Sequence, residues 1–141
     1  MIFHQPIEEK EALLMNPLQL AYMGDSVWEL IVRERLVIQR KNVHHMHLEC
    51  VQSVNAAAQA ALLKILSPHL TDTEKSVVQR GRNAHTKHPA PKNQERADYA
   101  ESTGFEALIG YLYISGNMER LTGLLTYIFA ERNMTWQNRK S

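Results

Sequence analysis

A helical repeat of apolar residues with Asp25 in its middle constrains this chain more than any other feature. The repeat follows Asn16-Pro17 at spacings of 4, 3, 4, 3 and 4, and consists of Leu18, Tyr22, Asp25, Glu29, Val32 and Leu36. This spacing places its members on one stripe of an α-helix. A carboxylate is costly to bury there unless a cation, a metal ion or a hydrogen-bonding neighbour pairs with it. Asp25 is therefore either a helix cap or satisfied core residue, or a functional group.

A second isolated acid, Glu106, lies in the apolar stretch from Thr103 to Tyr113. The stripe that carries it consists of Tyr99, Thr103, Glu106, Gly110 and Tyr113. Apolar helices of one small domain pack against each other, so packing can bring Glu106 beside Asp25. Paired carboxylates suit Mg²⁺, a hard cation that activates water and neutralises charge on a phosphate. The competing interpretation is that both acids are satisfied or face the surface.

Two glycines accompany the two acids. Gly24 precedes Asp25, and Gly110 follows Glu106 by four residues. An interior glycine costs a helix roughly 1 kcal/mol relative to alanine, so each glycine needs a reason. For Gly24 we expect the close approach of another helix or a ligand. Gly110 indicates either a tight helix crossing or space for a metal ion or a phosphate.

The sequence predicts one all-α domain, residues 1–141, built from about six helices. Asn16-Pro17 and the run from Thr71 to Glu74 are typical helix starts, whereas Ser67-Pro68 is a typical end. The expected helices cover roughly residues 8–15, 17–40, 44–66, 71–83, 94–115 and 118–132. A basic loop is expected at 85–93 and a flexible tail at 133–141.

The stretch from Gln79 to Asn93 is rich in cations and prolines and contains no acid. Its cations are Arg80, Arg82, Lys87 and Lys92. Such a loop can bind phosphates by charge and counterion release, or can simply be a solvated surface loop. Because the net charge of the chain is only +1, this local cluster is the main indication of a nucleic-acid partner.

Cysteine content and hydropathy favour a cytoplasmic protein. Cys50 is the single cysteine, which excludes an internal disulfide and suits a reducing compartment. The polar N-terminus does not resemble a signal peptide, and no apolar run reaches the ~18 residues of a membrane span. His44, His47 and Cys50 have a spacing that could suggest zinc. Zinc sites usually pair such close ligands with a distant second pair, so we favour a small core cysteine beside polar helix residues.

Taken together, three motifs resemble a known family. LAYMGDSVWE (20–29) resembles the signature helix of the ribonuclease III catalytic domain, and STGFEALIGYLY (102–113) resembles its second catalytic helix. The intervening RGRNA…PKN segment resembles the smaller Mini-ribonuclease III branch. The motifs occur in the family's order over nearly the whole chain, and their combination is far more specific than any one of them.

The resemblance implies an all-helical homodimer that cuts double-stranded RNA with Mg²⁺. Asp25 and Glu106 would be the metal-binding catalytic carboxylates, and water activated by the ion would leave 5′-phosphate and 3′-hydroxyl ends. Tyr22 matches the aromatic position at the family's dimer interface. The four cations named above, Arg80, Arg82, Lys87 and Lys92, would contact RNA. The Mini branch matures both ends of the 23S ribosomal RNA precursor, sometimes with a ribosomal protein assisting.

The sequence also departs from the larger enzymes of the family. Ala21 and Thr103 stand where those enzymes carry further acids, and Glu101 stands where the branch is expected to carry an aromatic residue. We expect no double-stranded-RNA-binding domain, so the loop and the dimer groove would supply the RNA affinity. The missing acids keep a non-catalytic RNA-binding or ribosome-associated protein open as an alternative. A plain helical dimerisation module would leave the acid-free basic stretch unexplained.

Overall fold

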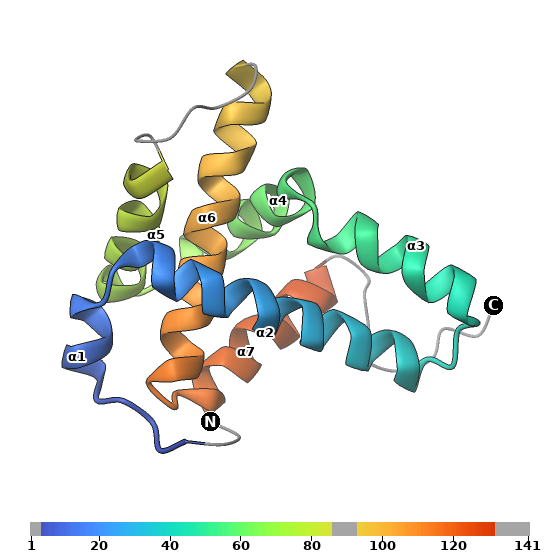
Figure 1. Ribbon diagram of the computed structural model, residues 1–141, viewed down its shortest axis with the longest axis horizontal. Helices are drawn as coiled ribbons and strands as arrows, with labels where there is room; N and C mark the ends of the chain where they lie inside the picture. The colour runs from blue at the N-terminus through green and yellow to red at the C-terminus, as the bar shows by residue number, and fades with distance from the viewer. Residues whose placement is uncertain (1–3, 86–92, 132–141) are drawn as a thin grey trace.

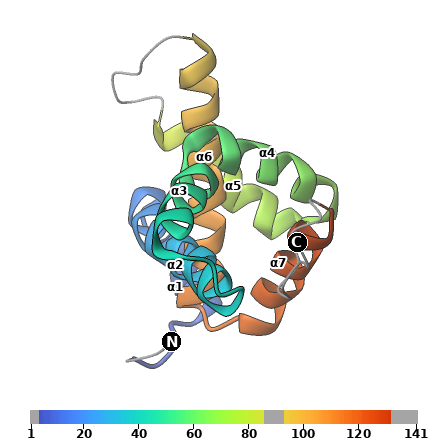
Figure 2. The ribbon, with the colours of Figure 1, turned by 90° about the vertical axis from the view of Figure 1, so that its right-hand side faces the viewer.

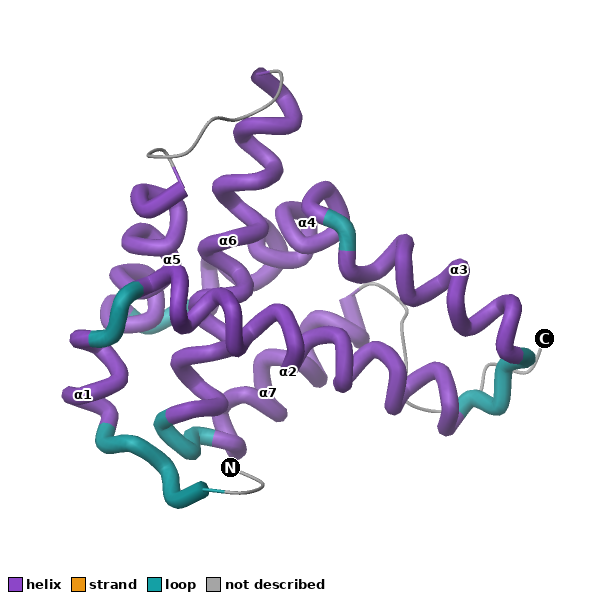
Figure 3. Tube along the Cα trace, in the orientation of Figure 1, coloured by secondary structure: helices purple, strands orange, loops and turns teal. Residues whose placement is uncertain are grey.

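The computed structural model describes residues 4–85 and 93–131, which form seven α-helices and no strand (Figure 3). The helices are α1 (Glu9–Leu14), α2 (Pro17–Ile38), α3 (Val43–Val54), α4 (Ala56–Leu66), α5 (Asp72–His85), α6 (Asn93–Ile114) and α7 (Met118–Glu131), with a short 3₁₀ turn at Ser67–His69. The prediction of an all-α fold is confirmed. Within the described ranges, no helix has both the length and the apolar character needed to cross a membrane.

Helix α6 is the centre of the bundle. It packs against α2, α4, α5 and α7, and α2 runs across it (Figure 1). Trp28 of α2 meets the edge of Phe105 on α6 at a ring distance of 5.2 Å and stacks on Phe129 of α7 at 6.2 Å. All three side chains are buried, and large aromatic rings contribute strongly to core stability. This cluster fixes α2 against α6. The outer end of α6 projects beyond the rest of the bundle (Figure 2).

Two helix starts follow the capping chemistry that the sequence predicts. The side chain of Asn16 accepts a hydrogen bond from the backbone N–H of Leu18 at 2.8 Å, and Pro17 occupies the first turn. Thr71 and Glu74 form a reciprocal capping box at the start of α5, with bonds of 2.8 and 3.1 Å. Such caps satisfy N–H groups that a helix leaves unpaired at its first turn. They therefore set where α2 and α5 begin.

The single helix predicted over residues 44–66 is wrong, because the structure has two helices there. Asn55 separates α3 from α4 in an extended conformation, with φ −73° and ψ 162°. Its side-chain oxygen accepts from the N–H of Ala58, and its amide nitrogen donates to the carbonyls of Val51 and Gln52. One asparagine thus caps both helix ends and lets the chain change direction without a glycine or a proline.

Candidate active site

The crossing of α2 and α6 is a contact between two backbones. A Cβ atom placed on Gly24 would lie 1.7 Å from the carbonyl oxygen of Glu106, and one placed on Gly110 would lie 1.9 Å from that of Leu20. Any side chain larger than hydrogen at either glycine would force the helices apart. The close approach expected at Gly24 is thus made by another helix, and Gly110 belongs to the same tight crossing.

This crossing brings the two isolated acids together. Asp25 follows Gly24 directly, and Glu106 supplies the carbonyl that Gly24 faces. The two side chains are close enough that Asp25, through a hydrogen bond and through its charge, raises the pKa of Glu106. Residues 81 positions apart in the chain therefore share one site, as the sequence predicted.

The stripe around Asp25 is buried over only part of its length. Tyr22 and Asp25 are exposed, whereas Val32 and Leu36, further along the same stripe, are buried. Crossing helices touch over a short length only, so a helix face is buried only where a neighbour covers it. Asp25 therefore lies at the rim of the crossing with its carboxylate accessible to solvent.

Glu106 has the more unusual environment of the two acids. Its pKa is raised to about 8, first by burial and then by the hydrogen bond and negative charge of Asp25, while a hydrogen bond from Gln59 acts in the opposite direction. A carboxyl with this pKa holds a proton at neutral pH unless a cation replaces it. The pair is an exposed acid beside a largely buried one, a difference typical of functional sites.

The donor set fits a hard divalent cation. No lysine or arginine in residues 4–85 and 93–131 forms an ion pair with Asp25 or Glu106. In the same ranges, no third His, Cys, Asp or Glu completes a metal-ligating cluster with them. Mg²⁺ is usually held by one or two carboxylates, with waters and substrate phosphates as its other ligands. Two adjacent carboxylates provide the charge and the oxygen atoms that such an ion needs.

A buried amide beside Glu106 was not anticipated from the sequence. Gln59 on α4 has no exposed surface, and its amide nitrogen donates to Oε2 of Glu106 at 3.4 Å. Its amide oxygen accepts from the hydroxyl of Ser102 on α6. The signal was present in the sequence: Gln59 is a polar residue three, four and seven positions before the buried leucines of the same helix, Leu62, Leu63 and Leu66.

The basic stretch begins as a helix and not as a loop. Helix α5 extends to His85, slightly beyond the end predicted near residue 83, and most of the loop predicted at 85–93 lies outside the described residues. A Cβ atom on Gly81 would lie 2.9 Å from Cα of Gly104 on α6. This close packing explains why α5 remains helical where few apolar side chains are left. Lys87 and Lys92 lie outside the described residues.

The two arginines of this stretch contact different partners. The guanidinium of Arg80 donates to the backbone carbonyls of Leu13 and Met15, and so holds the end of α1. Arg82 forms a two-pronged ion pair with Glu101 on α6, with nitrogen–oxygen distances of 2.8 to 3.0 Å. Glu101, which departs from the branch pattern, therefore partners a residue of the predicted RNA-binding set.

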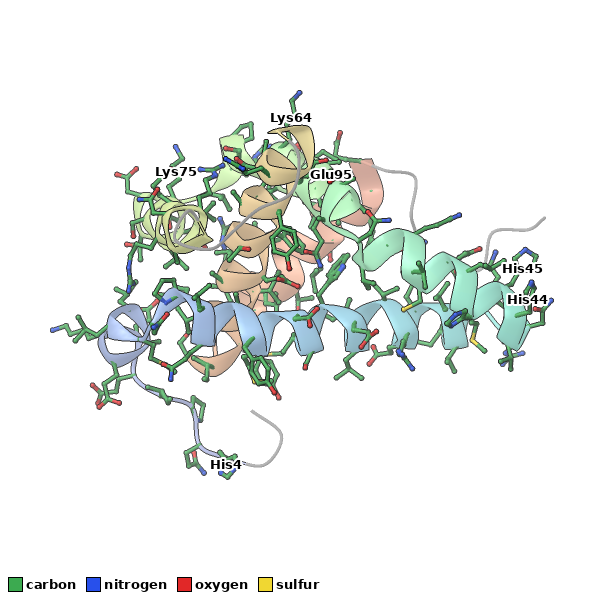
Figure 4. The ribbon with its side chains drawn as sticks, turned by 45° about the horizontal axis from the view of Figure 1, so that its top comes forward. His4, His44, His45, Lys64, Lys75 and Glu95 are labelled. Atoms are coloured by element: carbon green, nitrogen blue, oxygen red, sulfur yellow. The ribbon has the colours of Figure 1, made fainter. Side chains whose placement is uncertain are left out.

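The histidine and cysteine spacing on α3 does not form a shared site near the crossing. Cys50 is buried in the core, whereas His44 and His47 are exposed. Figure 4 shows His44 and His45 at the far end of α3, away from the region where α2 crosses α6. The core interpretation of Cys50 agrees with this burial.

Comparison with known proteins identifies the family. The sequence profile of the ribonuclease III domain matches residues 18–117. The chain belongs to the ribonuclease III domain family. It is 51% identical to Mini-ribonuclease 3 of Symbiobacterium thermophilum, over 80% of this chain and 87% of that protein. It is 43% identical to Mini-ribonuclease 3 of a Thermoanaerobacter species, over 82% of each chain. The family predicted from the three motifs is confirmed.

The fold of the family is also found among solved structures. A protein from Fusobacterium nucleatum, solved by X-ray crystallography, superposes with a TM-score of 0.76 over 89% of this chain and 99% of its own, at 23% sequence identity. This likeness supports the helical architecture. The Mini-ribonuclease 3 relatives and the domain match establish the activity class: an endoribonuclease acting on double-stranded RNA, in a family that is typically metal-dependent.

Proposed function

We propose that this chain is a Mg²⁺-dependent homodimeric endoribonuclease that matures the 5′ and 3′ ends of the 23S ribosomal RNA precursor. The observation that carries the proposal is the pairing of Asp25 with Glu106 at the glycine crossing of α2 and α6. The family supports cleavage of double-stranded RNA. The resemblance to the Mini branch supports a stem of precursor 23S ribosomal RNA as the substrate.

Asp25 and Glu106 have distinct roles in this proposal. An ion bound between them would activate water and neutralise charge on the scissile phosphate. Asp25 is exposed and would present its carboxylate on the RNA side of the site. Glu106 is partly buried and would hold the ion on the side of the helical core, losing its proton when the ion binds. The remaining ligands would come from water and from RNA, because two carboxylates alone do not fill the coordination shell of the ion.

Cations of the basic stretch would bind the RNA backbone. We assign this role to Arg82, Lys87 and Lys92, since phosphate contacts dominate the affinity of such complexes. On binding RNA, Arg82 would replace its ion pair with Glu101 by one with a phosphate. Losing the first ion pair reduces the net binding free energy gained from the second. Arg80, expected from the sequence to belong to the same set, contributes to the packing of α1 through its two carbonyl contacts.

An exposed apolar surface on α2 supports the homodimer. Tyr22 is 83% exposed, and Leu30 and Val37 on the same helix are 50% and 60% exposed. A groove of about 320 Å³ opens between α2 and α3, with Val43 and Val51 in its wall. Large exposed apolar side chains on a helix that borders such a groove support an interface on this helix. Replacing Tyr22 with glutamate is expected to give monomers in light scattering, whereas Leu14→Glu on α1 leaves the mass unchanged.

Cleavage of a double-stranded RNA stem by Asp25→Asn tests the catalytic assignment. We expect no Mg²⁺-dependent product, an unchanged melting temperature within a few degrees, and RNA binding close to that of the wild type. Glu34→Gln removes an exposed acid from the same helix and is expected to cut normally. Cleavage by Asp25→Asn at the wild-type rate would remove Asp25 from the active site.

The salt dependence of RNA binding tests the basic set. Each phosphate contact contributes roughly one unit to the slope of log affinity against log salt concentration. We expect Arg82→Gln and Lys92→Gln each to weaken binding of duplexes of any sequence and to reduce this slope. An unchanged slope in the double variant would place the RNA elsewhere on the molecule.

A further inference from the structure

Gln59 is the most deeply buried polar side chain in the described part of the chain. It has no exposed surface, on a helix whose buried residues are otherwise leucines. Burying an amide without hydrogen bonds costs several kcal/mol in an apolar environment. An aliphatic residue would fill the same position without that cost. The hydrogen bonds of the amide must therefore explain why a glutamine is buried here.

Both bonds of the amide go to one face of α6. Ser102 and Glu106 are four residues apart, so their side chains are neighbours on that helix. The hydroxyl of Ser102 donates to the amide oxygen of Gln59, and the amide nitrogen donates to Oε2 of Glu106. The opposite orientation would set the amide oxygen against the oxygens of an ionised carboxylate. The ionised carboxylate of Glu106 therefore selects this orientation of Gln59, and the hydroxyl of Ser102, which can donate or accept, satisfies the amide oxygen.

This network fixes a torsion that would otherwise be loose. The terminal torsion of a glutamate side chain has broad minima, so the carboxylate turns freely unless something holds it. The donor from Gln59 binds one oxygen of Glu106 and thereby sets the rotation of the group. A lysine or arginine would do the same but would neutralise the charge that attracts a cation. A neutral amide orients the carboxylate and preserves its charge.

We propose that Gln59 is a positioning residue of the catalytic centre, which holds the Glu106 carboxylate in the rotation that binds a divalent cation together with Asp25. Ser102 anchors the amide of Gln59 through its hydrogen bond to the amide oxygen. This inference rests on the proposed function, because it requires the cation to bind at Asp25 and Glu106. Groups that orient metal ligands typically change metal affinity or activity by about 10- to 100-fold when they are replaced.

The experiment must separate positioning from a purely structural link between α4 and α6. Gln59→Leu removes the amide but leaves the hydroxyl of Ser102 without its partner, and this variant is expected to melt at a lower temperature. The double variant Gln59→Leu with Ser102→Ala removes both polar groups and restores an apolar contact. Its melting temperature is expected within a few degrees of the wild type. Leu63→Val reduces buried volume on the same helix without touching this network, and serves as the control.

Mn²⁺ binding to the full chain without RNA is the first readout, measured by electron paramagnetic resonance. The second is the Mg²⁺ concentration that gives half-maximal cleavage in single-turnover reactions. We expect the double variant to bind Mn²⁺ roughly tenfold more weakly and to need correspondingly more Mg²⁺, with much of its rate recovered at saturating Mg²⁺. Ser102→Ala is expected to show a smaller change in the same direction, and Leu63→Val none.

Two results would overturn the inference in different ways. If the wild type binds Mn²⁺, Asp25→Asn does not, and the folded double variant binds as tightly as the wild type, Gln59 is a structural link only. The proposed function then survives. If Asp25→Asn binds Mn²⁺ as tightly as the wild type, the cation site itself is misplaced, and the role of Gln59 falls with it.

Discussion

Adding one methyl group at the helix crossing is predicted to destabilise the whole domain. In Gly24→Ala the new Cβ would lie 1.7 Å from a backbone oxygen of Glu106, whereas ordinary contact begins at 3.4 Å, so the helices must separate locally by about 1.7 Å. Alanine gains about 1 kcal/mol in helix propensity. Overpacking costs about 1–3 kcal/mol, and more where the obstacle is backbone that no rotamer change can clear. Taking the upper end of that cost, because the obstacle is backbone, we expect a net loss of about 2 kcal/mol.

Thermal and urea denaturation of the wild type, Gly24→Ala and Gly123→Ala measures this effect. A loss of about 2 kcal/mol corresponds to a fall in melting temperature of roughly 4–8 °C for a chain of this size. Gly123→Ala on α7 is the matched control, because nothing lies within 4 Å of a Cβ at that position. It is expected to gain up to about 1 kcal/mol. If Gly24→Ala is as stable as Gly123→Ala, α2 and α6 do not cross in contact, and the juxtaposition of Asp25 with Glu106 loses its basis.

Two further predictions concern charge and packing. The pKa of Glu106 is about 8 in the fold against an ordinary 4.5, so the native state keeps a proton that the unfolded chain loses between these values. Without divalent cations, the contribution of Glu106 to stability should therefore be fully present below pH 4.5 and be lost as the pH rises to 8. Glu106→Gln should flatten this dependence in urea melts at several pH values, and an equally steep decline would contradict the assignment. Arg80→Met should loosen α1, seen as faster amide exchange at Leu13 and Met15, with little change in the salt slope of RNA binding. Unchanged exchange, or a slope reduced as in Arg82→Gln, would return Arg80 to the RNA-binding set.

Much of the fold was predictable because its signals are local. Asn16-Pro17 and the pair Thr71 and Glu74 act within one helix turn, so their sequence spacing determines their hydrogen bonds. The all-helical class follows from periodicity over many residues. Asn55 escaped prediction because an asparagine within a helical pattern has several possible roles, and its capping bonds exist only after the chain has turned.

The site was predictable in its acids and less so in its supporting groups. Asp25 and Glu106 stand out because each is a lone charge in an apolar stretch. Their meeting depends on two helices in contact, which Gly24 and Gly110 indicated but did not determine. The sequence left the exposure of Asp25 open, since periodicity defines a helix face but not which part of that face a neighbour covers. The pairing of Arg82 with Glu101 likewise depends on how α5 and α6 align.

Anomalous X-ray diffraction from crystals grown with Mn²⁺ tests the central claim most directly. The account predicts one strong manganese peak bonded to carboxylate oxygens of both Asp25 and Glu106, lost in crystals of Asp25→Asn. A peak bound elsewhere, with Asp25 and Glu106 turned away from each other, would contradict it.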